Sequence, residues 1–179
     1  TMPPIPFVHV NPDLKKRHQR IADHLDNALS NHELDVYFQP KVNLKSNTVD
    51  GAEALLRWNR GNKAGIKPDE FMPIVENSEL IHRIGAWVIN EACRACKTWE
   101  QASDHLLNVA VNVSALQLTR SNFYQIVVDA LEQYKLPPER LEIEITEHFL
   151  VPEDTVVTQQ LATLKRLGVI LVVDDFGTG

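Results

Sequence analysis

The chain alternates between short apolar segments typical of strands and longer segments with apolar residues at helical spacing, and this alternation most constrains its fold. After two strand-like segments at 35–44 and 49–58, the pattern predicts helices over 79–101, 121–134 and 152–167, alternating with strands over 108–114, 141–147 and 169–175. Such alternation favours parallel strands with helices packed outside them. A doubly wound sheet and a (β/α)8 barrel both fit the pattern.

The two N-terminal strand segments are close enough in sequence to form an antiparallel hairpin. Ser46-Asn47 supplies a turn between the segments 35–44 and 49–58. Pro40 lacks an amide donor, so we expect it to mark a sheet edge, a bulge or a strand end.

Proline, asparagine and glycine mark several helix boundaries. Asn11-Pro12 is expected to begin a helix that ends near residue 30, because asparagine caps helices and proline suits the first turn. Pro68 opens another helix, which Pro73 is expected to break or restart. Gly168 stands where the helix over 152–167 should end.

The composition is that of an ordinary soluble globular protein, and it limits the partners. The 179 residues suffice for one domain with a sizeable core, and they are 44% apolar and 23% charged. The net charge of -6 argues against broad binding to a nucleic acid polymer or an anionic membrane, but leaves room for a local phosphate site. Since no apolar run approaches a membrane span and the first residues lack signal-peptide features, we expect a cytoplasmic domain without direct membrane insertion.

Cys93 and Cys96 form a CxxC motif inside a helical pattern. Such a motif can be a redox pair or half of a zinc site. A zinc site needs about four ligands, and no second Cys/His cluster accompanies this motif. We therefore expect two small, partly buried helix residues.

The strand over 49–58 carries a carboxylate and a guanidinium where apolar residues are usual. Side chains alternate along a strand, so Glu53, Leu55 and Arg57 share one face. Taken alone, this strand is as compatible with a structural ion pair as with a functional site.

Later strands repeat the arrangement. Each has one apolar face for the helices and one face with oxygen-bearing side chains near its C-terminal end. In a barrel that face points into the lumen, at the end where active sites form, and the following residues would converge there: Glu53, Asn112, Glu144, Asp174 and Asp175. Antiparallel strands with solvated polar faces are the alternative, which the helical segments between the strands disfavour.

So many carboxylates can lie together only if protons or cations compensate them. The donors are hard oxygens, without a convincing His or Cys, and they favour Mg²⁺ or Mn²⁺ over Zn²⁺ or Cu²⁺. A metal pair can clamp a phosphodiester and activate a water for in-line displacement, and Arg57 suits phosphate oxygens. Spacing alone thus predicts a metal-dependent α/β enzyme acting on a phosphorylated or enolisable substrate.

Six short motifs occur in order on the expected elements: Tyr37-Phe38-Gln39-Pro40, Glu53-Ala54-Leu55-Leu56-Arg57-Trp58, Pro68-Asp69-Glu70-Phe71-Met72-Pro73, Asn112-Val113-Ser114-Ala115-Leu116-Gln117-Leu118, Glu144-Ile145-Thr146-Glu147 and Asp174-Asp175-Phe176-Gly177-Thr178-Gly179. Together they resemble the EAL-domain phosphodiesterases of bacterial cyclic di-GMP signalling, over residues 14–179, with residues 1–13 as a lead-in. The resemblance implies an α/β fold, a TIM-type (β/α)8 barrel with an antiparallel first strand, of which only about five strands are present in this chain.

The resemblance also implies hydrolysis of cyclic di-GMP to linear pGpG by a two-metal mechanism with Mg²⁺ or Mn²⁺. The implied metal ligands are Glu53, Asn112, Glu144, Asp174 and Asp175, and three of them are catalytic: Glu53, Asp174 and Asp175. Gln39 and Arg57 would bind the substrate, and Glu147 would stabilise the loop that begins at Phe176-Gly177.

The chain departs from the family at its end. The family's later strands, with a Lys and further Glu and Gln residues, are absent, so we expect a domain truncated on its C-terminal side and inactive by itself. The resemblance also implies fusion to a sensory or GGDEF domain in the parent protein, and it is compatible with a homodimer. A catalytically inactive cyclic di-GMP receptor and a different metal-dependent barrel enzyme are the alternatives. The intact Glu53 argues against the receptor, because such receptors often lose the acidic motif.

Overall fold

The computed structural model describes residues 12–59, 65–102, 105–146 and 155–174. Its strands form one five-stranded sheet in the order β1-β2-β3-β4-β5. The strands are β1 (Leu34–Asn43), β2 (Thr48–Trp58), β3 (Asn108–Val113), β4 (Leu141–Thr146) and β5 (Ile170–Asp174). The first two strands pair antiparallel and the others follow in parallel, which confirms the predicted hairpin and the parallel βα units.

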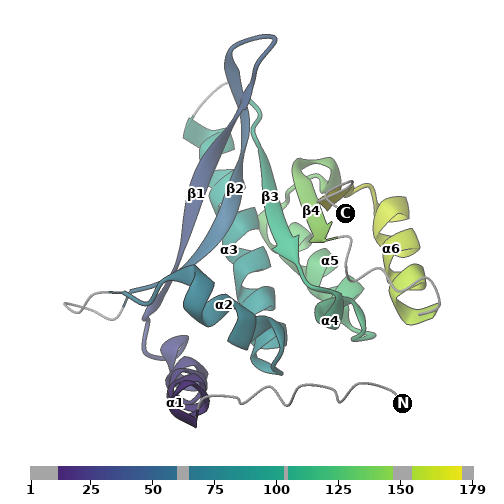
Figure 1. Ribbon diagram of the computed structural model, residues 1–179. Coiled ribbons are helices and arrows are strands. Elements are labelled where there is room, and N and C mark those ends of the chain that lie inside the picture. The colour runs from purple at the N-terminus through teal and green to yellow at the C-terminus, as the bar shows by residue number, and fades with distance from the viewer. Residues whose placement is uncertain (1–11, 60–64, 103–104, 147–154, 175–179) are drawn as a thin grey trace, which may run out of the picture.

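The described helices are α1 (Pro12–Ala28), α2 (Pro68–Glu76), α3 (Leu80–Ala102), α4 (Ala115–Leu118), α5 (Phe123–Tyr134) and α6 (Thr155–Leu167), with a 3-10 turn η1 (Pro138–Arg140) before β4. In Figure 1, α3 runs behind β2 and β3, and the turn between β1 and β2 projects beyond the other strands. A sequential strand order fits part of a barrel. It differs from a doubly wound sheet, in which the strand order reverses at a switch point.

The core lies between the sheet and the helices. Val109, Val111 and Val113 of β3 are buried, as are Ile143 and Ile145 of β4. Alternation along both strands therefore turns their apolar residues toward the helices, as predicted, and the intervening residues toward the opposite face.

Two helix predictions need correction. Pro73 does not break its helix: it lies inside α2, whose flanking residues Phe71 and Val75 are buried and hold the segment against the core. The helix expected over 121–134 begins at Phe123 and is preceded by the short helix α4. Gly168 ends α6 as predicted, with a φ of 109° and an amide that donates to the carbonyl of Leu164.

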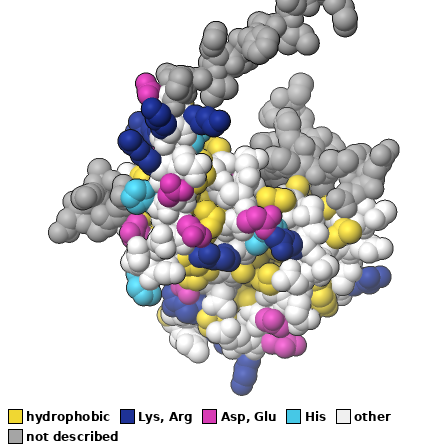
Figure 2. Space-filling view, turned by 90° about the horizontal axis from the view of Figure 1, so that it is seen from below, with side chains coloured by type: hydrophobic (Ala, Val, Ile, Leu, Met, Phe, Trp, Pro, Cys, Tyr) yellow, Lys and Arg dark blue, Asp and Glu magenta, His cyan; other side chains and the backbone are white. Residues whose placement is uncertain are grey.

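Ion pairs join α1 to the rest of the fold. Arg17 pairs with Glu70 of α2, and Asp26 pairs with Arg83 of α3 at 3.1 Å. On the face seen in Figure 2, acidic and basic side chains are interspersed. Within the described part of the chain, no helix has the combination of length and hydropathy needed to cross a membrane.

Candidate functional site

The backbone register places the predicted site residues on one face of the sheet. Gln39 of β1 stands opposite Glu53 of β2, which stands opposite Ala110 of β3. Asn112, two residues further along β3, stands opposite Glu144 of β4. Opposite residues point to the same side of a sheet, so these positions share the face that the helices leave free.

Glu53 and Asn112 are in direct contact. The side-chain amide of Asn112 donates to Oε1 of Glu53 at 2.7 Å, across the junction of β2 and β3. Asn112 is exposed and Glu53 is half-buried. The two residues thus form one polar unit on adjacent parallel strands.

Glu144 is the most buried carboxylate of this face, with 8% of its surface exposed. Its partner is Lys41 of β1, whose ammonium group donates to Glu144 and, at 2.7 Å, to Oε1 of Glu142. Lys41 stands opposite Gly51 of β2, where a Cβ would lie only 2.6 Å from the backbone oxygen of Asn108. The missing side chain at Gly51 permits the close approach of β3.

Burial governs the electrostatics of this group. Burial raises the pKa of Glu144, Glu142 and Glu53 raise it further, and Lys41 opposes the rise. Burial alone would lower the pKa of Lys41, but hydrogen bonds and charge from Glu142 and Glu144 together raise it. The site therefore holds negative charge that is costly without a cation.

Arg57 has no ion pair among the described residues. One of its nitrogens donates to the carbonyl of Leu56 at 3.0 Å, and its guanidinium lies 5.9 Å from the centre of the Tyr37 ring. Within the described part of the chain, Arg57 forms no ion pair with Glu53. The structural ion pair between Glu53 and Arg57, which β2 alone could have contained, is therefore not formed in the described part of the chain.

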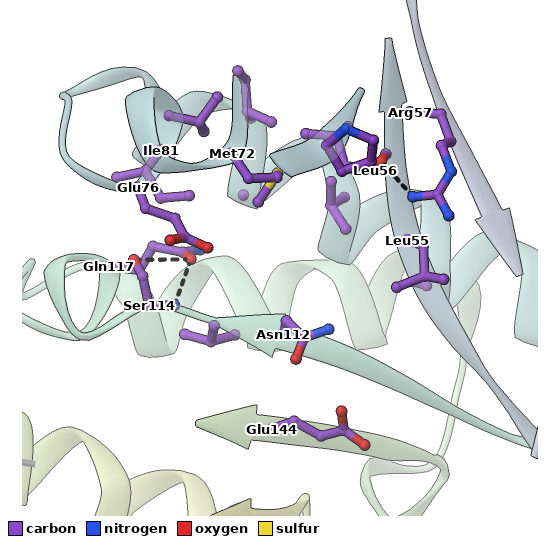
Figure 3. Close-up of a pocket in the computed structure, with 17 residues that line it drawn as sticks. Leu55, Leu56, Arg57, Met72, Glu76, Ile81, Asn112, Ser114, Gln117 and Glu144 are labelled. Atoms are coloured by element: carbon purple, nitrogen blue, oxygen red, sulfur yellow. Dashed lines mark hydrogen bonds between the residues drawn. The ribbon is translucent and has the colours of Figure 1, made fainter. Parts of the chain in front are cut away.

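A cavity of about 300 Å³ opens beside this polar group, between β2, β3, α2 and α3. Apolar residues form most of its wall, including Leu55, Pro68, Met72, Ile81 and Val88. In Figure 3, Asn112 and Glu144 lie on one side of it, Arg57 near another, and Glu76 across from them. The cavity thus combines an apolar wall with acidic, basic and amide groups, as small-molecule sites do.

The remaining predicted residues lie at or beyond the limits of the described chain. Asp174 ends β5 and stands opposite Thr146, two positions after the pair formed by Val172 and Glu144. Asp175 and Glu147 lie outside the described residues. Across the described ranges, no group of three or more His, Cys, Asp and Glu side chains is arranged to hold a metal ion.

The donors that are described still suit a hard cation. Glu53 and Glu144 offer carboxylate oxygens and Asn112 an amide oxygen, from three adjacent strands. The raised pKa of Glu144 shows the cost of its burial, and a divalent ion would offset that cost. The chemistry of these donors therefore fits Mg²⁺ or Mn²⁺.

Sequence reasoning missed Lys41. Lys41 follows Gln39 by two residues in the same strand, so both side chains lie on the same face. This spacing could have indicated that Lys41 lies near the site. Its carboxylate partners lie three strands away, so no spacing in the sequence identifies them.

A model of the EAL domain family matches residues 22–179. The chain is 36% identical over 170 residues to the bifunctional diguanylate cyclase/cyclic di-GMP phosphodiesterase MucR of Pseudomonas aeruginosa, covering 95% of this chain and 25% of MucR. It is also 36% identical over 155 residues to the oxygen sensor protein DosP of Escherichia coli, covering 87% of this chain and 19% of DosP. The chain thus spans a quarter or less of either relative.

Solved structures of EAL proteins are also similar to this chain. The phosphodiesterase of MucR in complex with c-di-GMP superposes with a TM-score of 0.82 at 36% identity, covering 89% of this chain and 65% of that one. The EAL enzyme Bd1971 in its cAMP and cyclic-di-GMP bound form gives 0.83 at 30% identity, covering 92% of this chain and 46% of that one. The predicted fold class is confirmed: a mixed α/β domain whose five strands correspond to part of a TIM-type barrel.

Proposed function

The chain belongs to the EAL domain family, and from that premise we propose that its protein hydrolyses cyclic di-GMP to linear pGpG with Mg²⁺ or Mn²⁺. One observation carries the proposal: Glu53, Asn112 and Glu144 lie on one sheet face, beside a cavity with a largely apolar wall. The cyclic di-GMP complexes of two similar EAL proteins support the choice of ligand.

The proposed metal ligands are Glu53, Asn112, Glu144, Asp174 and Asp175. A divalent pair, when bound, supplies an acidified water and charge stabilisation at the phosphodiester. Asn112 fixes one oxygen of Glu53 through its amide, which orients the carboxylate before any ligand arrives. Glu147 retains its proposed role of stabilising the loop after β5.

The substrate would be held by groups around the cavity. Arg57 is half-buried and lines the cavity, so we propose that it binds a phosphate through two parallel hydrogen bonds. Leu55, Pro68 and Met72 form an apolar wall against which a purine face can pack, and Gln39 lies beside Glu53.

The lengths of the relatives support a further proposal about organisation. Residues 14–179 would be the EAL part of a longer signalling protein, joined to a sensory or GGDEF domain.

Glu53→Ala tests the assignment. In the purified whole protein with Mn²⁺, we expect it to lower pGpG formation by at least ~100-fold, because it removes a ligand at the reacting phosphodiester. Glu132→Ala, an exposed carboxylate of α5, is the matched control and should retain full turnover. Full turnover by Glu53→Ala would refute the assignment. Wild-type protein that binds cyclic di-GMP with Mn²⁺ present but releases no pGpG would establish the receptor instead.

A further inference from the structure

Lys41 joins the first strand of the sheet to the fourth. Its ammonium group binds Glu142 and Glu144 of β4, although β2 and β3 lie between these two strands in the sheet order. The strand register shifts directly after Lys41, between it and Val42. A bulge of this kind changes the direction of a side chain locally.

Lys41 is the cation in contact with these carboxylates. The described ion pairs of Glu142 and of Glu144 are both with Lys41, whereas the described side-chain partner of Glu53 is the neutral amide of Asn112. Lys41 is itself less than half exposed, so its charge is only partly screened by water.

We propose that Lys41 sets the metal affinity of the site by sharing Glu144 with the metal, and that Glu142 is the partner that retains Lys41 when the metal takes Glu144. This inference rests on the proposed role of Glu144 as a metal ligand. An oxygen of Glu144 that receives the ammonium group is less available to a divalent ion, so Lys41 lowers the affinity. Glu142 reduces that penalty, because Lys41 keeps one carboxylate after it releases the other.

Lys41 also has an opposite effect on the protein without metal. Glu142 and Glu144 are close neighbours, and Glu144 is buried, so their charges repel unless a cation lies between them. Removing Lys41 should therefore tighten metal binding and weaken the metal-free fold. A variant that merely disturbs the structure would weaken both.

The experiment measures Mn²⁺ affinity by calorimetry, and the melting temperature in chelator, for the purified whole protein and its variants. Lys41→Met keeps much of the side-chain length without the charge, and we expect roughly three- to tenfold tighter Mn²⁺ binding with a melting temperature lower by several degrees. Lys45→Met is the matched control, since Lys45 is an exposed lysine of the same hairpin. It should change neither quantity.

Glu142→Gln should change the Mn²⁺ affinity in the opposite direction. It leaves Glu144 as the one carboxylate bound to Lys41, and we expect roughly threefold weaker Mn²⁺ binding. In a Lys41→Met background the same change should have a much smaller effect. Additive effects would indicate long-range electrostatics and overturn the proposal.

Glu144→Gln separates this inference from the proposed function. If it weakens Mn²⁺ binding while Lys41→Met leaves the affinity unchanged or weaker, the inference about Lys41 is wrong and the ligand assignment stands. If Glu144→Gln leaves the affinity unchanged, the ligand assignment fails and the inference with it.

Discussion

Cys93 and Cys96 lie one turn apart in α3, and both are free thiols in the core. Burial raises the pKa of Cys93 to about 12, and the neighbouring Cys96 adds to the shift. Burial also raises the pKa of Cys96, against the opposing charge of Arg140, and its thiol donates to the carbonyl of Leu107 at 3.1 Å. Thiolates are the reactive form of cysteine, so this CxxC pair is a packing feature of α3, and it is more deeply buried than predicted.

We expect neither thiol to be alkylated in the folded protein at mildly alkaline pH, and both to be alkylated rapidly in denaturant, as counted by mass spectrometry. The pKa of Cys93 is 9.0 in an ordinary environment and about 12 in the folded protein. At a pH below 9.0 the thiol is protonated in both states, and its contribution to stability is fully present. As the pH rises from 9.0 toward about 12, the unfolded chain loses this proton more readily, and the contribution is lost. Cys93→Ala should therefore flatten the alkaline loss of stability. Rapid alkylation of the native protein would contradict the burial argument.

That Glu53, Asn112 and Glu144 lie on one face of the sheet could be predicted, because side-chain alternation is a local property of each strand. Their role as metal ligands stays a prediction. The contact of Lys41 with Glu142 and Glu144 could not be predicted. It depends on the distance between β1 and β4, which are separated by two other strands in the sheet.

At the scale of elements, α3 and α4 approach each other through a glycine. The side chain of Gln117 is buried and accepts a hydrogen bond at 3.0 Å from the amide of Ser114, the cap of α4. A Cβ at Gly85 would lie 2.8 Å from Cδ of Gln117. Gly85 thereby gives Gln117 room to close the turn that follows β3, two residues beyond Asn112.

Gly85→Ala should destabilise the protein by about 1–3 kcal/mol, although alanine usually stabilises a helix, because Gln117 must leave its position. Urea denaturation gives the value. In a Gln117→Ala background the same substitution should be neutral or stabilising, since the obstructing side chain is gone. A stabilising effect of Gly85→Ala alone would show that Gln117 moves at little cost.

Element types followed from periodicity, but some boundaries did not. The helix of Pro73 continues because Phe71 and Val75 are buried on either side, an effect of packing that a local proline rule omits. Helix α4 is too short to show a periodic pattern, and it is defined instead by the contact of Gln117 with Ser114.

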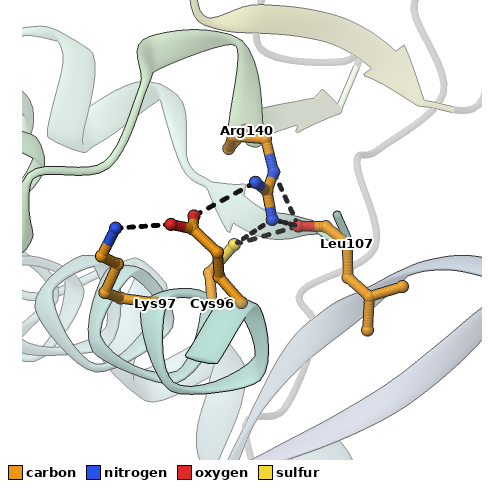
Figure 4. A network of polar contacts seen from close by, with 5 residues as sticks. Cys96, Lys97, Leu107 and Arg140 are labelled. Carbon is orange, nitrogen blue, oxygen red and sulfur yellow. Dashed lines mark hydrogen bonds and ion pairs between the residues drawn. The ribbon is translucent and has the colours of Figure 1, made fainter. Parts of the chain in front are cut away.

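At the scale of the whole molecule, Arg140 connects segments that are distant in sequence (Figure 4). Its side chain is buried, and Nε donates at 2.9 Å to the carbonyl of Leu107, which precedes β3. The same guanidinium pairs with Glu100 of α3 at 3.3 Å, and Glu100 also pairs with Lys97 at 2.6 Å. Arg140 thus fixes the start of β4 to the end of α3 and the entry of β3.

Arg140→Met should destabilise the protein by about 2–4 kcal/mol, because the carbonyl of Leu107 loses buried donors and Glu100 loses a partner. Arg166→Met, an exposed arginine of α6, is the control and should cost less than about 0.5 kcal/mol. Thermal and urea unfolding both measure the difference. Equal effects of the two substitutions would mean that the buried network adds nothing to stability.

The choice between a doubly wound sheet and a barrel also belongs to this scale. Helices alternate with strands in both folds, so periodicity left the two open, and the strand order decides between them.

That order also has a consequence for the newly made chain. Since β1 to β5 pair in the order of synthesis, the strand that each new strand pairs with has always been translated before it. Lys41 precedes Glu142 by 101 residues, so the ribosome adds the lysine before the acidic strand β4. When β4 joins the sheet, Lys41 is therefore already present in the chain to neutralise part of the charge of Glu142 and Glu144, and we expect this to reduce the repulsion between them during folding.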